Sequence, residues 1–428
     1  MDTTALRQKL LDLAIRGRLV PQNPDEPAIE LDAEDTVPES EQPFEIPENW
    51  RWKKMRDLVQ LINGDRGKNY PSKSKLIITD TGYPFVSALN LKNGLINSEG
   101  LLYVTKEQFN TLRSGKIKSD DILLCIRGSL GKYGIAQKTG GAIASSLVIL
   151  RKKTSDLFIL YLLNILETPL FKNLIKDKKN GTAQPNLSAK DVGDFGIPLP
   201  PLAEQKRIVA KLEQLFEVID RCEEAQKQIA DTASQLRTSL LQAAIRGKLF
   251  PQDPDEPAIE LDAKDTVPES EQPFEIPENW RWVRLGNIIK LRSGEGLSKK
   301  NFKKGEYPVY GGNGLTGYHN NFNVLENTIV IGRVGYYCGN VRKTNSNTWV
   351  TDNALIVSIP ENINIDYMLY LLQSLNLGKS TSQTAQPVIT GKIIKPIIVS
   401  IPPLPEQKRI VSKLEQLFSI IETISNNV

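Results

Sequence analysis

Lysine and arginine residues are concentrated in two stretches of this 428-residue chain, 53–196 and 283–400. The first stretch has 23 Lys and Arg against 12 Asp and Glu, and the second has 13 against 6, which gives net charges of +11 and +7. Because the whole chain carries only +4, the rest of the sequence carries −14. Basic excess confined to two stretches indicates nucleic-acid binding, and the alternative is an ordinary solvated surface.

Each basic stretch contains a glycine-rich segment after an apolar run, GSLGKYG at 128–134 and GRVGYYCG at 332–339. An apolar run followed by glycines predicts a strand and a tight turn. Lysine and arginine neutralise phosphates, while arginine, asparagine and glutamine hydrogen-bond to base edges. We therefore predict nucleic-acid contacts from these turns and from the polar segments before them. The candidates are Arg66, Lys68, Lys73, Lys75, Arg127, Ser129, Lys132 and Tyr133, and then Arg292, Lys303, Lys304, Asn313, Arg333, Tyr336 and Tyr337.

Residues for catalysis are scarce. His319 is the only histidine, and Cys125, Cys222 and Cys338 are odd in number and widely spaced. This composition argues against metal sites, disulfide frameworks and histidine-activated nucleophiles. GSLGKYG lacks the spacing of a phosphate loop, GEG at 294–296 is not a dinucleotide fingerprint, and the Asn-Pro-Pro-Phe type of element used by amino-methyltransferases is absent. We predict no catalytic residue, metal or cofactor on this chain.

The basic stretches are held in a duplicated framework. Residues 21–52 return as 251–282 with two differences in 32 positions, and residues 204–216 return as 406–418. The two repeats have different offsets, 230 and 202, so the stretches between them are not copies of equal length. A repeat of this kind sets the architecture, here two variable modules on one scaffold. Recent duplication or recombination would explain the near-identity.

The scaffold is predicted to be helical. Between Glu204 and Arg246 apolar residues recur in alternating steps of four and three, the seam of a coiled coil. The central helix is predicted over 202–249, with 404–428 repeating its first half and 1–19 resembling its second half. We expect the two copies to pair antiparallel, with the termini close together and a pseudo-twofold relation between modules. The seam residues are Ile208, Leu212, Leu215, Ile219, Ile229, Leu236 and Leu240, and then Ile410, Leu414, Leu417 and Ile421.

The two modules, 46–201 and 276–403, are predicted to be diverged copies of one mixed α/β fold, which makes the chain α+β. The first shows a strand–turn–strand at 121–136, a strand at 144–153 and a helix at 155–181 capped by Ser155; the second echoes them at 327–341, 354–359 and 364–376. Gln184 and Gln386 lie in a shared TAQP and are expected to support structure rather than read bases. Trp50, Trp52, Trp280 and Trp282 are expected to pack where scaffold and module meet.

The remaining segments, 20–45 and 250–275, are acidic and rich in proline, which predicts extended connectors. No run of about 18 apolar residues could span a bilayer, and the N-terminus has no apolar signal core. We therefore expect a cytoplasmic protein with no membrane partner.

The combination of IPENWRW, a variable module, TAQPNLS and IPLPPLAEQKRIVAKLEQLF, present twice, resembles the specificity (S) subunits of Type I restriction-modification systems. The second copy reads SIPPLPEQKRIV where the first reads GIPLPPLAEQKRIV. The resemblance covers essentially the whole chain.

The resemblance implies that 46–201 and 276–403 are target recognition domains, each reading one half of a bipartite double-stranded DNA site, while the helices set the spacer. It also implies two modification subunits, which carry S-adenosylmethionine and methylate adenine, and restriction subunits that use ATP and Mg²⁺. The helices would dock the modification subunits.

Two other readings stay open at this point. One is a scaffold that joins two protein-binding modules, which the module charges disfavour and a gel-shift with partners would test. The other is a nuclease acting alone, suggested by Pro254-Asp255 with Asp262 and Lys264. The first copy has Glu34 in place of Lys264, and incubation with metal and DNA would decide.

Overall fold

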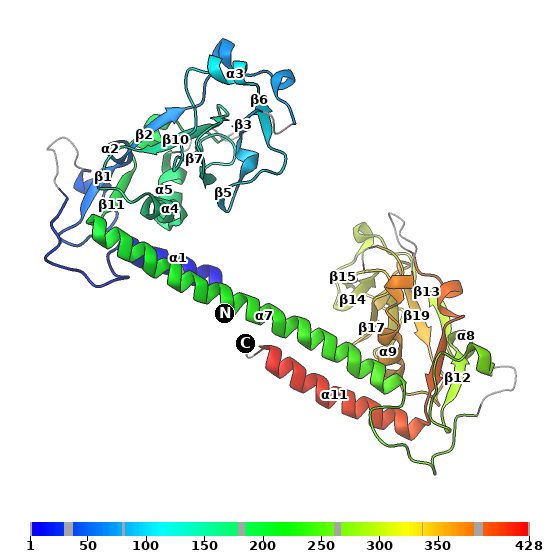
Figure 1. Ribbon diagram of the computed structural model, residues 1–428. Coiled ribbons are helices and arrows are strands. Elements are labelled where there is room, and N and C mark those ends of the chain that lie inside the picture. Colours follow the sequence, from blue (N-terminus) through cyan, green and yellow to red (C-terminus); the bar gives the residue numbers. More distant parts are fainter. Residues whose placement is uncertain are drawn as a thin grey trace. The chain divides into compact units, whose positions relative to one another are not determined.

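The computed structural model describes residues 2–29, 37–78, 82–178, 185–260, 267–335, 337–380 and 388–426. The chain divides into two compact units, residues 1–224 (unit 1) and 225–428 (unit 2). The boundary falls inside α7 (Leu202–Ile245), one helix of 44 residues that gives its first half to unit 1 and its second half to unit 2 (Figure 1).

A mixed six-stranded sheet forms the centre of unit 1, in the order β2-β10-β7-β8-β5-β4. Its strands are β2 (Val59–Asn63), β4 (Leu91–Lys92), β5 (Gly94–Ile96), β7 (Ile122–Cys125), β8 (Tyr133–Ile135) and β10 (Leu147–Lys152). Strand β7 is buried at every position, because a central strand is covered on both faces. Smaller sheets pair β1 (Arg51–Lys54) with β11 (Gly196–Leu199), and β3 (Tyr83–Val86) with β6 (Leu102–Val104) and β9 (Ala142–Ile143). The helices are α1 (Thr3–Ile15), α2 (Met55–Leu58), α3 (Lys106–Thr111), α4 (Ile159–Glu167), α5 (Pro169–Lys178) and α6 (Ala189–Gly193).

Unit 2 has a four-stranded sheet in the order β13-β19-β16-β17. Its strands are β13 (Lys290–Ser293), β16 (Ile329–Gly332), β17 (Val341–Lys343) and β19 (Ala354–Ser358). Smaller sheets pair β12 (Arg281–Arg284) with β20 (Ile398–Ile401), and β14 (Tyr307–Gly311) with β15 (Gly314–His319) and β18 (Trp349–Val350). The helices are α8 (Leu285–Ile288), α9 (Ile365–Ser374), α10 (Gly391–Ile394) and α11 (Leu404–Asn426).

The two modules share one topology. The order β2-β10-β7-β8 in unit 1 corresponds to β13-β19-β16-β17 in unit 2. Each unit also has a three-stranded sheet that contains one parallel pair, β3 with β9 in unit 1 and β14 with β18 in unit 2. The prediction that the modules are diverged copies of one fold is therefore confirmed. Unit 1 extends its central sheet by β5 and β4, for which no counterpart is found in the described part of unit 2.

Each module is fastened to the start of its long helix by a glutamine. Gln205 in α7 accepts a hydrogen bond from the Phe158 backbone N–H at the start of α4 (2.7 Å). Gln407 in α11 accepts one from the Asn364 backbone N–H at the start of α9, also at 2.7 Å. Both glutamine side chains are fully buried and donate to a proline carbonyl five residues earlier. The duplicated EQKRIV segment thus orients the same helix in each module.

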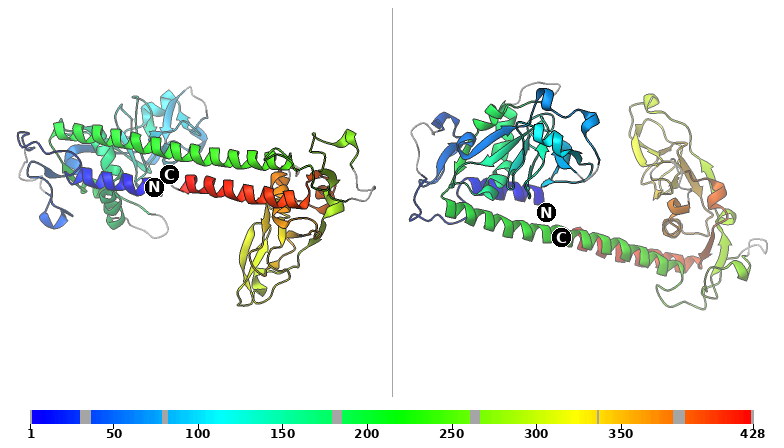
Figure 2. Two further views of the ribbon diagram at one scale, coloured as in Figure 1. Left: turned by 90° about the horizontal axis from the view of Figure 1, so that it is seen from below. Right: turned by 45° about the horizontal axis from the view of Figure 1, so that its top comes forward.

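Within each unit the long helices run antiparallel, as predicted. In unit 1 the Arg7 guanidinium in α1 contacts Asp220 (2.5 Å) and lies over the Phe216 ring. In unit 2 the equivalent Arg237 in α7 contacts Glu422 (3.6 Å) and lies over the Phe418 ring in α11. The views agree that α1 follows the first half of α7 and α11 follows its second half (Figures 1 and 2). Proximity of the two termini concerns the placement of one unit against the other and stays a prediction.

The predicted seam is shared with the modules. Ile208 and Leu212 are buried in one core cluster with residues of α1 and of module 1, and Ile410 and Leu414 are buried in another with residues of α7 and of module 2. Ile219 is also buried. Leu215, Ile229, Leu240, Leu417 and Ile421 are half-buried. Leu236 is 48% exposed and lines a surface pocket between α7 and α11 together with Ile229 and Ile421.

One predicted helix is two. The described part of the segment 155–181 forms α4 and α5, separated at Thr168, because Pro169 has no N–H to donate and holds Thr168 in an extended conformation (ψ 156°). The predicted cap at Ser155 is also wrong: α4 begins at Ile159, after Phe158. In unit 2 the helix predicted over 364–376 is confirmed as α9, and its cap Asn364 accepts from Asp366 and Tyr367.

The described parts of the acidic connectors, 21–29, 37–45, 251–260 and 267–275, contain only short 3-10 turns at Glu39–Glu41 and Glu269–Glu271. In these ranges the connectors therefore form neither α-helix nor strand. In the described part of the chain, no helix is both long and apolar enough to cross a membrane.

Candidate nucleic-acid interface

The first glycine-rich turn joins β7 to β8. Its ends are closed by hydrogen bonds from Cys125 N–H to the Lys132 carbonyl (2.7 Å) and from Gly131 N–H to the Cys125 carbonyl (3.0 Å). Gly128 and Gly131 have φ of +79° and +80°, where residues other than glycine are strained. The turn is anchored on residues 185–187, just after the first TAQ: Gly128 N–H donates to the Pro185 carbonyl (3.0 Å).

The second glycine-rich turn is anchored in the same way. It joins β16 to β17, and its Arg333 carbonyl accepts from Ile389 N–H (2.9 Å), just after the second TAQP. In unit 1 the matching bond runs from Leu187 N–H to the Ile126 carbonyl (2.9 Å). Leu187 and Ile389 are both buried. The segment after the shared TAQ therefore holds the turn in each module. Gln184 and Gln386 lie outside the described residues.

The arginines of the two turns do not occupy equivalent positions. The backbone bridges pair Arg127 with Asn186 and Val334 with Val388, so the counterpart of Arg127 is Val334. Arg333 corresponds instead to Ile126, which is buried. Because neighbouring residues of an extended segment point to opposite faces, the two modules present their arginines differently.

Of the candidate residues of unit 1 whose side chains are described, all but one lie at the surface. Arg66 and Lys68 at the 3-10 turn Gly67–Asn69, Lys75, Arg127, Ser129 and Lys132 are exposed. Tyr133 is half-buried in β8, and its hydroxyl donates to the Glu167 carboxylate at 2.5 Å. Burial and the Glu167 charge raise the pKa of Tyr133. The Lys73 side chain lies outside the described residues.

In unit 2 the structure places one candidate beside the second glycine-rich turn. The Asn313 side chain, in the β14–β15 turn, lies beside Gly335, because a Cβ at Gly335 would come within 3.7 Å of its Oδ1. Gly335 is two residues from Arg333. Arg292, Lys303 and Lys304 are exposed on other segments, and Tyr337 is 50% exposed. Tyr336 lies outside the described residues.

Two organising residues were missed by sequence reasoning. Asp65 is buried and accepts from the backbone N–H groups of Arg66 and Arg113, both at 2.7 Å. Its burial is outweighed by these hydrogen bonds, which lower the Asp65 pKa. Asn186 accepts a hydrogen bond from Arg127 Nε at 3.2 Å. The repeated TAQP beside Asn186 was the only available signal, and it identifies the duplicated segment without indicating the contact between Asn186 and Arg127.

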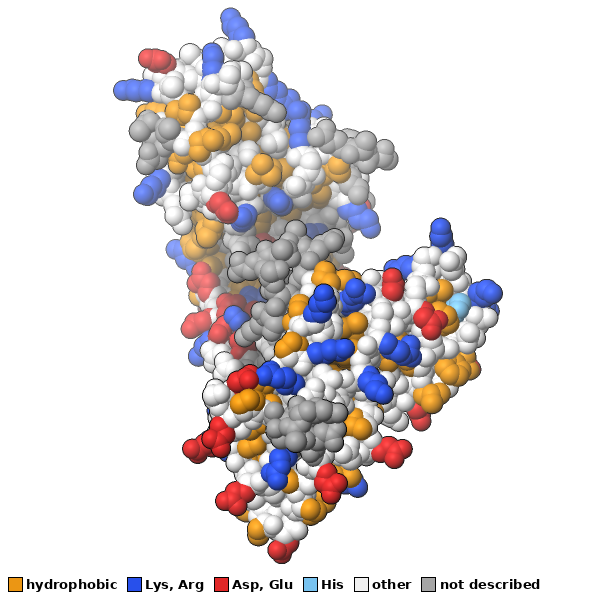
Figure 3. Space-filling view, turned by 90° about the vertical axis from the view of Figure 1, so that its right-hand side faces the viewer, with side chains coloured by type: hydrophobic (Ala, Val, Ile, Leu, Met, Phe, Trp, Pro, Cys, Tyr) orange, Lys and Arg blue, Asp and Glu red, His pale blue; other side chains and the backbone are white. Residues whose placement is uncertain are grey.

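Lys and Arg side chains gather on the face of unit 2 that Figure 3 turns to the viewer, and acidic side chains lie mainly around its margin. The acidic excess of the chain lies in the connectors instead. Residues 21–48 hold ten acidic and no basic residues. Opposite charges are therefore segregated between modules and connectors.

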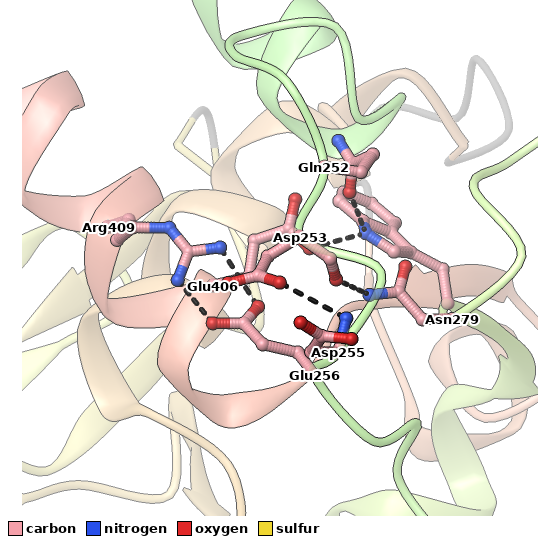
Figure 4. Close-up of polar contacts among 8 residues, drawn as sticks. Gln252, Asp253, Asp255, Glu256, Asn279, Glu406 and Arg409 are labelled. Carbon is pink, nitrogen blue, oxygen red and sulfur yellow. Dashed lines mark hydrogen bonds and ion pairs between the residues drawn. The ribbon is translucent and has the colours of Figure 1, made fainter.

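The connectors are tied to the long helices by a duplicated polar cluster, shown for unit 2 in Figure 4. Trp280 Nε1 donates to Glu406 at 2.9 Å, and Arg409 forms a two-pronged ion pair with Glu256. In unit 1 Trp50 Nε1 donates to Glu204 at 2.9 Å, and Arg207 pairs with Glu26 in the same way. We call each set a junction cluster. All four tryptophans of the IPENWRW repeats are buried, which confirms their predicted packing role.

The buried carboxylates of the junction clusters are unusual. Glu204 is fully buried, and its burial raises its pKa against the hydrogen bonds from Trp50 and Gln22, which lower it. Burial likewise raises the pKa of Glu406. By contrast, the Arg207 hydrogen bond holds the pKa of Glu26 below its ordinary value. Perturbed carboxylates can mark catalysis, but here each is used to close a connector onto a helix.

Within the described ranges, no group of three or more His, Cys, Asp or Glu residues could hold a metal ion. Cys125 and Cys338 are buried free thiols, and burial raises the pKa of both.

The family model of the Type I restriction modification DNA specificity domain matches residues 47–231 and 277–428. Each match begins at the IPENW repeat and runs through one module into the long helix that follows. The chain belongs to this family. The two matches coincide with the duplication, since each contains one module, one glycine-rich turn and one EQKRIV helix start.

Curated members of the family resemble the chain over most of its length. It is 24% identical to the Type I restriction enzyme EcoEI specificity subunit of Escherichia coli, over 99% of this chain and 90% of that protein. It is 24% identical to the EcoKI specificity subunit of E. coli K12, over 90% and 85%. The match to the EcoAI specificity subunit is 26% identical, over 68% of this chain but only 63% of that protein.

Solved structures share the fold. A chain from a structure described as the basis of complex assembly and conformational transition of the type I R-M system matches with a TM-score of 0.67 and 21% identity, over 90% of this chain and 94% of that one. The HsdS subunit from Thermoanaerobacter tengcongensis matches with a TM-score of 0.55 and 20% identity, over 91% and 94%.

Proposed function

We propose that this chain is the DNA-recognition subunit of a Type I restriction-modification complex, in which each module binds one half of a bipartite site. The observation that carries the proposal is the shared topology of the modules combined with unlike residues at equivalent positions of their turns. One fold with two different reading surfaces is what recognition of two different half-sites requires.

The modules bind DNA in two ways. Exposed lysines and arginines neutralise phosphates, which supplies affinity that falls with rising salt. Side chains on the turns reach base edges in the groove and supply the sequence preference. The candidates for both roles are those predicted above, with Arg127 and Asn313 the best placed for base edges.

The long helices convert two short readings into one specific reading. A helix of 44 residues is about 66 Å long. When both modules are carried by one helix, binding of the first half-site raises the effective concentration of the second module at its own half-site. The helix length then selects the gap between the half-sites.

The subunit recognises DNA and performs no chemistry of its own. Two modification subunits would dock on the helices, one for each duplicated half, and would carry S-adenosylmethionine for adenine methylation. Restriction subunits would supply ATP- and Mg²⁺-dependent cleavage. Such a complex acts on chromosomal and incoming DNA, which places it in the cytoplasm.

A module exchange tests this proposal. In the variant, residues 53–196 replace residues 283–400, so that both positions carry module 1 between identical IPENWRW and EQKRIV segments. The wild-type and variant chains, each assembled with modification subunits, would select duplexes from a random pool. We expect a split motif with two different halves for the wild type and the first half twice for the variant. If the wild-type complex selected duplexes with no sequence preference, the proposal would be refuted.

A further inference from the structure

The contact between Arg127 and Asn186 joins a candidate DNA-reading residue to a segment outside its turn. Arg127 is exposed, and its Nε donates to Asn186 Oδ1 at 3.2 Å. The backbones of the two residues also form an antiparallel bridge. The Asn186 backbone is held on both sides, since Pro185 accepts from Gly128 N–H (3.0 Å) and Leu187 donates to the Ile126 carbonyl (2.9 Å). Asn186 Oδ1 is therefore an acceptor on a fixed piece of backbone.

The hydrogen-bonding capacity of the Arg127 guanidinium indicates what this contact does. A guanidinium has five N–H donors in a planar fork, and Asn186 occupies the one on Nε. Among the described residues, no partner is found for the four donors on the two terminal nitrogens. A pair of parallel donors of this kind matches the O6 and N7 acceptors of guanine, the commonest specific arginine contact in the major groove. Holding Nε also limits the rotation of a long side chain, which would otherwise be ordered only on binding.

We propose that Asn186 is a positioning residue that holds the Arg127 guanidinium so that its terminal nitrogens read a guanine in the half-site of unit 1. The inference rests on the proposed function and names a residue and a base within it. Asn186 itself need not touch DNA.

Unit 2 supplies the matched comparison. The counterpart of Asn186 is Val388, which forms the same backbone bridge with Val334. Valine is thus compatible with the bridge, and Asn186→Val removes the side-chain acceptor while leaving the backbone pairing possible. Asn186→Asp restores an acceptor for Nε. Val388→Asn introduces a side-chain amide opposite Val334, which has no guanidinium for the amide to hold.

The test is competition binding by the full chain assembled with modification subunits, against duplexes in which each base pair of both half-sites is changed singly. In the wild type one G·C pair of the unit 1 half should show about 5- to 150-fold discrimination, the range of a two-pronged contact. Arg127→Ala should abolish it at that pair only. Asn186→Val should lower it about three- to tenfold, the size of one hydrogen bond.

Three further results belong to the expectation. Asn186→Asp should recover most of the discrimination, because the ratio between matched and changed duplexes is insensitive to a uniform loss of affinity from the added charge. The double variant Arg127→Ala with Asn186→Val should be no worse than Arg127→Ala alone. Val388→Asn should change no position. Amide hydrogen exchange at Gly128 and Leu187 checks that the bridge is intact in each variant.

The positioning role is overturned if Asn186→Val leaves discrimination unchanged with the bridge intact, or if its effect falls on a different pair from that of Arg127→Ala. A uniform loss of affinity over all duplexes would also overturn it, since that outcome describes a phosphate or structural role. If the wild type shows no preference at any pair, it is the proposed function that fails.

Discussion

Truncation of Glu204 to alanine should loosen the unit 1 junction more than the equivalent change at Glu406 loosens unit 2. Both carboxylates accept a hydrogen bond from a buried tryptophan at 2.9 Å. The surroundings differ, however. Trp280 Nε1 has a second acceptor in Gln252 Oε1 at 3.1 Å, whereas Gln22 in unit 1 uses its Nε2 to donate to Glu204 at 2.6 Å.

The expected magnitudes follow from which donors lose their partners. In Glu204→Ala the buried Trp50 Nε1 has no acceptor left, at a cost of about 1–3 kcal/mol, while the exposed Gln22 amide is rehydrated. We expect a loss of about 2 kcal/mol at this junction. In Glu406→Ala Trp280 keeps Gln252, and Glu406 Oε1 has no hydrogen-bond partner to lose, so we expect about 1 kcal/mol or less.

Hydrogen exchange in the full chain can follow both junctions at once. The segments after the two tryptophan pairs differ in sequence, KKMRD against VRLGN, so peptides from the two units can be told apart. A loss of about 2 kcal/mol corresponds to roughly thirtyfold faster exchange where opening is local and at equilibrium. The β1–β11 amides should show this in Glu204→Ala, and the β12–β20 amides should change fivefold or less in Glu406→Ala.

The exposed Glu213 on the same helix provides the control, because Glu213→Ala makes the same change in charge without touching the junction. Equal effects of the two junction variants, or a larger effect in unit 2, would refute the reasoning from donors and acceptors. An effect of Glu213→Ala as large as that of Glu204→Ala would attribute the change to charge alone.

Three other outcomes are expected. Burial raises the pKa of Glu204 above the ordinary 4.5, so its contribution to junction stability should decline as pH rises from about 4.5 toward neutrality. Amide hydrogen exchange of the junction measured across this pH range should show the decline in the wild type and not in Glu204→Gln. Seven residues inserted after Lys227 lengthen α7 by about 10 Å with little change of helical phase. Duplexes selected by this variant should gain two to three base pairs in the gap and keep both half-sites. An unchanged gap would count against the spacer role. The double change Lys303→Ala and Lys304→Ala should lower the slope of log affinity against log salt by up to about 2 with the motif unchanged, whereas a changed motif would mean that these lysines read bases.

Much of the fold follows from local pattern. The continuous apolar runs at 122–125 and 147–150 predict central strands, and β7 and β10 are buried neighbours in the sheet. The alternation of four and three residues predicts a long helix, and α7 is one. These predictions are correct because the residues on which they rest are close together in the sequence. The strand order of the sheets depends on pairings across a hundred residues, and nothing in the local pattern specifies it.

The errors have the same origin. Pro169 divides one apolar run into α4 and α5, although the hydrophobic period continues across it. The heptad pattern predicts a helix partner for Ile208 and Leu212, and their core cluster does include Leu11, Ala14 and Ile15 of α1, but it also includes module 1 residues that the pattern does not identify. An apolar periodicity tells which face of a helix is buried and does not tell what buries it.

The candidate site was predictable in kind and less so in geometry. Charge and glycine-rich turns located exposed residues such as Arg127 and Lys132. The offset between Arg127 and Arg333 could not be predicted, because it depends on which residue bridges Asn186 and which bridges Val388. The pairing of Arg207 with Glu26 joins residues 181 positions apart, and only the repeat of both in unit 2 gave any hint of it.

The most direct measurement is the methylated-adenine map of a host that expresses the modification subunits, read at single-base resolution with this gene intact and deleted. If this chain is the DNA-recognition subunit, one split motif should be methylated in the first strain and unmethylated in the second, and the module exchange should convert it to a motif with the first half twice. An identical set of methylated motifs in the intact and deleted strains, with the modification subunits present in both, would show that the chain does not direct methylation.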